Sequence, residues 1–294
     1  MHVVTGATGN TGRVVAETLL AAGKDVQVIG RSEERLRPLV DKGAEAFVGS
    51  LDDAQAMTIA FSGAVGVYAM IPARFDVADY RVYQRQIGES LTAAIHEAGV
   101  KHVVNLSSMG AQHAQGTGVV VGLHEQEERL NRLGNVNVLH LRPGFFMENL
   151  YHSVGTIRAM GVIGWPMQGD KAAPMIAARD IGTYAAERLV KLDFSGKSVR
   201  ELLGPRDVSL EEVTRAIGAA MGRDDLSYVQ HPYEEAEEAL VGMGMTTTTA
   251  RQLVDLYRGF NDGLVAATEA RSVENTTPTS IEEFAQTFAQ VFKG

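Results

Sequence analysis

A glycine-rich turn near the start of the chain, within MHVVTGATGNTG (residues 1–12), constrains the fold most strongly. A short β-branched run at residues 3–4 precedes the turn, and an amphipathic helical segment, residues 14–22, follows it. Strand, tight turn and helix start in this order let a backbone approach a pyrophosphate, because the helix N-terminus offers free N–H groups and a positive dipole end. A glycine turn without a ligand is the alternative, but this context favours a dinucleotide site. The residues predicted to form it are Gly6, Thr8, Gly9, Asn10, Thr11 and Gly12.

Strand-like and helix-like segments alternate through the first half of the chain. This alternation predicts a doubly wound parallel sheet of the Rossmann kind, an α/β fold that binds ligands at the carboxyl ends of its strands. Strands are expected at 3–4, 26–29, 46–48, 65–70, 102–106 and 136–141, and helices at 14–22, 33–42, 52–61, 79–98 and 123–133.

The second half of the chain has a different pattern, in which helical periodicity dominates. We predict a dinucleotide-binding domain over residues 1–150, rejoined by a helix and a strand near 177–205, and a smaller, mainly helical substrate-binding lobe over 151–294. A helix is expected at 151–160. Asp180 is expected to cap a helix at 181–191, and Ser209 with Glu212 predicts a capping box.

Composition narrows the class of protein. With 294 residues, of which 45% are hydrophobic and 21% charged, the chain is typical of globular domains. A net charge of −9 argues against a nucleic-acid partner, and no apolar run approaches the roughly 18 residues that span a membrane. There are no cysteines and no histidine pair with metal-ligand spacing. We therefore expect a cytoplasmic monomer or homodimer without a metal, and the strand-like start argues against a signal peptide.

Arg31 follows the second strand, where NAD-binding proteins usually place a carboxylate for the ribose hydroxyls. Arg35 lies one helical turn further on. A guanidinium can bind a 2′-phosphate that a carboxylate would repel, so we predict NADP(H), with NAD(H) as the second cofactor. The alternative role for Arg31 is capping or stacking on adenine.

The ends of the later strands are expected to surround the nicotinamide. The cofactor-binding candidates there are Ile71 and Pro72 after the fourth strand, Ser107 after the fifth, and Pro143 and Phe145 after the sixth. Ser107 and Asn149 are also candidate catalytic residues, and His152 is a further one. Methionines and Trp165 in the following segment are expected to suit a flat aromatic ligand, with ordinary core packing as the alternative.

These motifs together resemble the NmrA-like family of atypical short-chain dehydrogenase/reductases. The matching segments are TGATGNTG at the start, Arg31, LSSMGA after the fifth strand, LRPGFFMENL after the sixth, ARDIG at 178–182 and ENTTPTSIEEFA at 274–285. The resemblance implies NAD(P)H-dependent reduction of quinones, azo or triphenylmethane dyes or plant phenolic ethers. The family that it resembles also includes redox-sensing regulators that bind the dinucleotide and catalyse little.

One departure from the superfamily concerns proton transfer. Catalytic short-chain dehydrogenases use a tyrosine followed four residues later by a lysine, whereas Val120 and His124 occupy these places here. His124 is therefore a candidate for proton donation or for binding the ribose, and a surface histidine is the alternative.

Three functions are compatible with this pattern. Hydride transfer to a conjugated acceptor delocalises charge and needs little acid catalysis, so we favour an NADPH-dependent reductase of a quinone or other aromatic acceptor, bound in a cleft between the lobes. The alternatives are a non-catalytic NADP(H)-binding redox sensor and an oxygenase or reductase that tailors an aromatic polyketide-type product.

Overall fold

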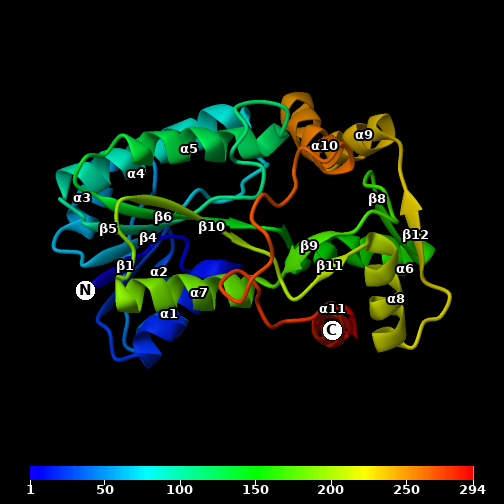
Figure 1. Cartoon of the computed structure of the whole chain (residues 1–294), viewed down its shortest axis with the longest axis horizontal. Coiled ribbons are helices and arrows are strands. Elements are labelled where there is room, and N and C mark those ends of the chain that lie inside the picture. Colours follow the sequence, from blue (N-terminus) through cyan, green and yellow to red (C-terminus); the bar gives the residue numbers. More distant parts are fainter. Residues whose placement is uncertain (294) are drawn as a thin grey trace.

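A seven-stranded parallel sheet forms the centre of the computed structural model, which describes residues 1–293 (Figure 1). The strand order β10-β6-β5-β4-β1-β2-β3 reverses direction beside β1, as expected of a doubly wound Rossmann sheet. At one edge of the sheet, β10 (Lys197–Leu202) pairs in parallel with β6. The strands are β1 His2–Val4, β2 Val26–Gly30, β3 Glu45–Val48, β4 Gly66–Met70, β5 His102–Leu106, β6 Asn137–Pro143 and β10 Lys197–Leu202.

Three helices cover each face of the sheet (Figure 1). Apolar side chains on both faces are buried, which is why the inner strands are rich in valine and leucine on both sides. Gly182 lets α7 (Ala178–Lys191) approach α1 (Asn10–Ala21) closely, since a Cβ there would lie 2.6 Å from the Cβ of Val14. One face carries α1 Asn10–Ala21, α2 Glu33–Val40 and α7 Ala178–Lys191, and the other α3 Ala54–Phe61, α4 Tyr80–Glu97 and α5 Val121–Asn131.

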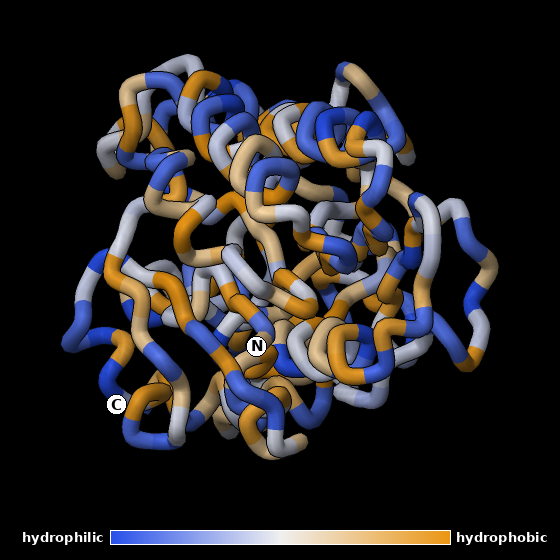
Figure 2. The backbone as a smooth tube through the Cα atoms, turned by 90° about the vertical axis from the view of Figure 1, so that its left-hand side faces the viewer, coloured by the Kyte–Doolittle hydropathy of each residue, from blue (hydrophilic) through white to orange (hydrophobic). Residues whose placement is uncertain are grey.

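The rest of the chain packs around a second core at one end of the sheet (Figure 1). Its longest helices each bury one face, as Leu210, Val213 and Ile217 do at a helical spacing. Figure 2 shows hydrophilic and hydrophobic residues alternating in the same way along helices that face the viewer. Two small sheets join this core: β7 Phe145–Phe146, β9 Ala173–Ile176 and β11 Asp207–Val208 form one, and β8 Val162–Trp165 and β12 Ser227–Gln230 the other. The helices are α6 Val154–Met160, α8 Leu210–Met221, α9 Tyr233–Gly242, α10 Thr247–Asn261 and α11 Ile281–Lys293, with short 3₁₀ segments η1 Gly118–Val120 and η2 Met147–Ser153.

Several helix starts differ from their predictions. The helix predicted at 151–160 is wrong in its first part, because η2 runs to Ser153 before α6 begins. The predicted cap at Asp180 is also wrong: α7 already begins at Ala178, and the Asp180 carboxylate accepts hydrogen bonds from the backbone N–H and the hydroxyl of Thr279. The capping box of Ser209 and Glu212 is confirmed at the start of α8.

The described residues 1–293 contain no helix that is both long and apolar enough to cross a membrane. Within the same residues, no three potential metal-ligating side chains of histidine, aspartate or glutamate cluster together.

Candidate functional site

The glycine turn between β1 and α1 is tightly folded. Gly6 has a φ of 60°, in the left-handed region that favours glycine, and the Gly9 N–H donates to its carbonyl at 2.9 Å. A Cβ on Gly12 would lie only 2.3 Å from the Gly6 carbonyl oxygen. No side chain caps the N-terminus of α1, where Gly9 is the N-cap residue. The first N–H groups of this helix are therefore available to an anionic ligand.

A buried hydroxyl pair supports this turn from β4. The fully buried Tyr68 donates its hydroxyl to Thr11 Oγ1 at 2.8 Å, and burial raises the pKa of Tyr68 so that it stays protonated. The Thr5 hydroxyl donates to the Tyr68 carbonyl at 3.0 Å and accepts from the Met70 N–H at 3.1 Å. These bonds fix the turn relative to the end of β4.

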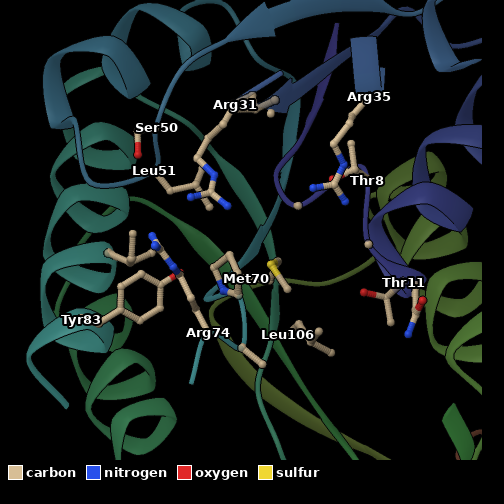
Figure 3. A pocket seen from close by; sticks show the side chains of 18 of the residues that line it. Thr8, Thr11, Arg31, Arg35, Ser50, Leu51, Met70, Arg74, Tyr83 and Leu106 are labelled. Carbon is tan, nitrogen blue, oxygen red and sulfur yellow. The ribbon is translucent and has the colours of Figure 1, made fainter. Parts of the chain in front are cut away.

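One large cleft, with a volume of about 930 Å³, runs along the carboxyl ends of the strands. The glycine turn forms part of its wall, and Figure 3 shows Thr8 and Thr11 there, with Met70 and Leu106 at the strand ends. Of the predicted site residues, those that line the cleft are Gly6, Thr8, Gly9, Asn10, Thr11, Arg31, Arg35, Pro72, Asn149 and His152.

Arg31 and Arg35 extend into the cleft from the end of β2 and from α2 (Figure 3). Ser32 begins α2 by accepting a hydrogen bond from the Arg35 N–H, which fixes the spacing of the two side chains. The ion pair on this helix joins Arg37 to Asp41 instead, and within residues 1–293 neither Arg31 nor Arg35 has an acidic partner. Two uncompensated guanidinium groups thus face the cleft.

The other end of the cleft combines apolar and polar side chains from β5 and from the segment around η2. Leu106 and Phe146 contribute apolar surface, followed by Glu148, Asn149, Tyr151 and His152. Burial raises the pKa of Glu148, whose carboxylate accepts from the Ala178 N–H at the start of α7. Tyr151 stacks on Phe288 of α11 with 5.5 Å between ring centroids, so the C-terminal helix supports this wall.

Two predicted catalytic side chains lie outside the cleft lining. Ser107 is buried and donates its hydroxyl to Glu127, a carboxylate that also accepts from Arg142. His124 donates from Nδ1 to the Ala111 carbonyl at 2.9 Å. Both side chains are thus bonded to the protein away from the cleft surface.

Four predicted cofactor-binding residues also fall outside the lining: Gly12, Ile71, Pro143 and Phe145. Phe145 packs edge-to-face on Trp165 and Phe260 in the core of the lobe, whereas Phe146 faces the cleft. Successive side chains of an extended strand point to opposite sides, so the prediction chose the wrong neighbour. Trp165, Met167 and Met175 are buried core residues and do not line the cleft either.

Sequence reasoning missed the cleft residues that follow β3, and it missed Arg74 beside α4. Ser50, Leu51 and Asp52 follow β3, and Arg74 and Tyr83 stand on the far wall (Figure 3). The residues after β3 could have been found, because all strands of a parallel sheet end at the same edge. Arg74 also follows a strand end, but it lies beyond the first residues after β4, in a loop without a regular pattern that could single it out.

A Rossmann sheet, an uncapped helix behind a glycine turn and unpaired arginines after β2 define a dinucleotide-binding protein. The chain belongs to the NmrA-like family, whose model matches residues 2–287. An NAD(P)H azoreductase of Xenophilus azovorans is 30% identical over 295 residues, which is 100% of this chain and 97% of that protein.

Solved structures agree with the fold. An NADPH-dependent quinone oxidoreductase of Escherichia coli, complexed with NADPH, superposes with a TM-score of 0.82 at 23% identity, covering 98% of this chain and 99% of the other. The triphenylmethane reductase of Citrobacter sp., complexed with NADP(H), gives a TM-score of 0.80 at 18% identity with the same coverage. At these identities the likeness concerns the fold.

Proposed function

We propose that this protein is an NADPH-dependent reductase of conjugated aromatic acceptors such as quinones or azo compounds. The observation that carries the proposal is a single cleft that joins the glycine turn and two unpaired arginines to an apolar wall ending in Asn149 and His152. The chain is an NAD(P)H-dependent oxidoreductase of its family, and the family's azoreductase supports the acceptor class.

The residues of the cleft fit NADP(H). The Gly9 position leaves the cleft side of the turn without a Cβ, and the first N–H groups of α1 bind the pyrophosphate. Arg31 and Arg35 bind the 2′-phosphate that NAD(H) lacks, so NAD(H) binds more weakly. When bound, the dinucleotide supplies a hydride to the acceptor.

The residues at the acceptor end are suited to orienting an aromatic ring more than to donating a proton to it. Leu106 and Phe146 provide apolar contact for a planar ring, and the Asn149 amide is available to donate to an acceptor oxygen or nitrogen. The position of the usual tyrosine holds the buried Val120. A conjugated acceptor spreads the incoming charge and takes its proton from water, whereas a simple ketone needs a nearby acid.

The test is oxidation of NADPH by the purified protein with quinones, an azo dye and a simple ketone, followed by the absorbance of the reduced nicotinamide. We expect turnover of the conjugated acceptors and none of the ketone. Arg31→Glu should weaken NADPH binding by about tenfold or more, because it places a carboxylate against the 2′-phosphate. Arg37→Glu reverses the same charge outside the cleft and should leave binding unchanged.

A redox sensor is the second candidate, and the location of Ser107 and His124 away from the cleft favours it. Tight NADPH binding without oxidation of any acceptor would support the sensor and exclude the reductase. Turnover that requires oxygen would favour a tailoring oxygenase. A substrate site between the lobes, and a monomeric or homodimeric state, remain part of the proposal.

A further inference from the structure

A third arginine, Arg74, reaches the cleft from the wall opposite Arg31. It lies in residues 71–79, between β4 and α4. Figure 3 shows its side chain beside Tyr83, at the end of the cleft that Ser50 and Leu51 also line. This end is distinct from the acceptor end at Asn149 and His152, and the proposed function assigns Arg74 no role.

Aromatic packing holds Arg74 in place although its segment has no regular structure. Phe75, the next residue, packs on the buried Tyr80 with 4.9 Å between ring centroids. Tyr80 in turn packs on Tyr83 at 6.0 Å, with the two rings 26° from parallel. Arg74 is therefore anchored to the first two turns of α4, and Pro72 restricts the chain before it.

The guanidinium of Arg74 is available to a ligand. Its Nε donates to Asp76 at 3.1 Å, but the two side chains are 42% and 72% exposed, so this pair contributes little and does not occupy the other N–H groups of Arg74. Burial raises the pKa of Tyr83, and Arg74 and Arg31 both oppose that rise. The two guanidinium groups thus act on the same phenol from opposite walls.

We propose that Arg74 and Tyr83 form the second wall of the adenine site, facing Arg31 and Leu51. The inference rests on the proposed cofactor. A guanidinium plane stacks on an aromatic ring, and Arg31 can present its face to adenine while its edge binds the 2′-phosphate. Arg74 contributes the plane on the other side of the ring. It therefore contacts adenine, which NADPH and NADH share.

The experiment measures the dissociation constants of NADPH, NADH and reduced nicotinamide mononucleotide by nicotinamide fluorescence. Arg74→Met should weaken both dinucleotides by the same factor, about 3- to 30-fold, because it removes the stacking plane. Arg74→Lys should behave alike, since lysine keeps the charge but not the plane. The mononucleotide lacks adenosine and should bind every variant equally.

The control is Arg37→Met, which removes an exposed arginine that also has a neighbouring carboxylate but lies outside the cleft. If Arg74→Met weakened the binding of NADPH alone, and Arg74→Lys restored it, the proposal would be overturned, because Arg74 would then bind the 2′-phosphate through its charge. Unchanged affinity in Arg74→Met, with an unchanged melting temperature, would overturn it as well. Because the readout is binding, a wild-type protein that binds NADPH but reduces no acceptor refutes the reductase alone.

Discussion

Replacing Gly12 by alanine should destabilise the fold, and the structure gives the size of the effect. The new Cβ would lie 2.3 Å from the Gly6 carbonyl oxygen, 2.7 Å from the Gly6 carbonyl carbon and 3.0 Å from the Thr5 oxygen. All three are backbone atoms of a turn held by the Tyr68 bonds, so none can rotate away. Overpacking of this kind costs about 3 kcal/mol, whereas the gain in helix propensity is only about 1 kcal/mol.

The net loss of about 2 kcal/mol translates into a measurable melting shift. At about 2.1 cal/mol/K per residue, the 294 residues give an unfolding entropy near 0.6 kcal/mol/K, so Gly12→Ala should lower the melting temperature by about 3 °C. Differential scanning calorimetry of the protein without ligand measures it.

Gly9→Ala is the matched variant in the same turn. Its Cβ would lie 3.3 Å from the Gly6 carbonyl oxygen, a contact that a small adjustment relieves. Gly9 lines the cleft, so the added methyl group lies beside the ligand site. We expect a near-normal melting temperature but weaker NADPH binding. An unchanged melting temperature in Gly12→Ala, or a larger loss of stability in Gly9→Ala, would refute the argument that backbone approach selects glycine at position 12.

Two further predictions concern stability alone. Burial lowers the pKa of His140 from 6.5 to about 4, with Asn105 donating to Nδ1 and Nε2 donating to Asn131. Between these two pH values the unfolded chain therefore binds a proton on this residue that the folded form does not bind. The free energy of unfolding keeps the full contribution of neutral His140 above pH 6.5 and loses about 3 kcal/mol as the pH falls toward 4. Urea unfolding across this range should show a flatter profile in His140→Gln but not in the exposed His96→Gln, and equal slopes would contradict it. Ser209→Ala removes a confirmed capping box and should cost about 1 kcal/mol in the same assay, and no change would show that the cap is dispensable.

Local patterns in the sequence predicted much of the sheet and part of the cleft. The glycine turn and Arg31 are contiguous with a strand and a helix start, so their positions follow from short-range chemistry. The helix at 33–42 was placed within two residues of α2, which accommodates Pro38 in its interior. The prediction for Asp180 was wrong because its partner, Thr279, is 99 residues away in the sequence.

The candidate catalytic residues show the same contrast between local sequence patterns and long-range contacts. Ser107 follows a strand end, where a ligand contact is expected, yet its hydroxyl is bonded to Glu127 on a helix behind the sheet. Phe145 and Phe146 are neighbouring residues of the same type, so the sequence does not tell them apart. The pairing of β7 with β9 determines which of the two rings faces the cleft.

The Rossmann fold, the dinucleotide turn and the arginines after β2 follow from the sequence alone, because each depends on neighbouring residues and on the period of the hydrophobic pattern. Which side chains line the cleft depends instead on how distant segments pack together. Arg74 faces Arg31 across the cleft because the packing of α4 on the sheet brings together segments more than 40 residues apart. Such long-range juxtaposition leaves no periodic trace in the chain, so it is not readable from the sequence alone.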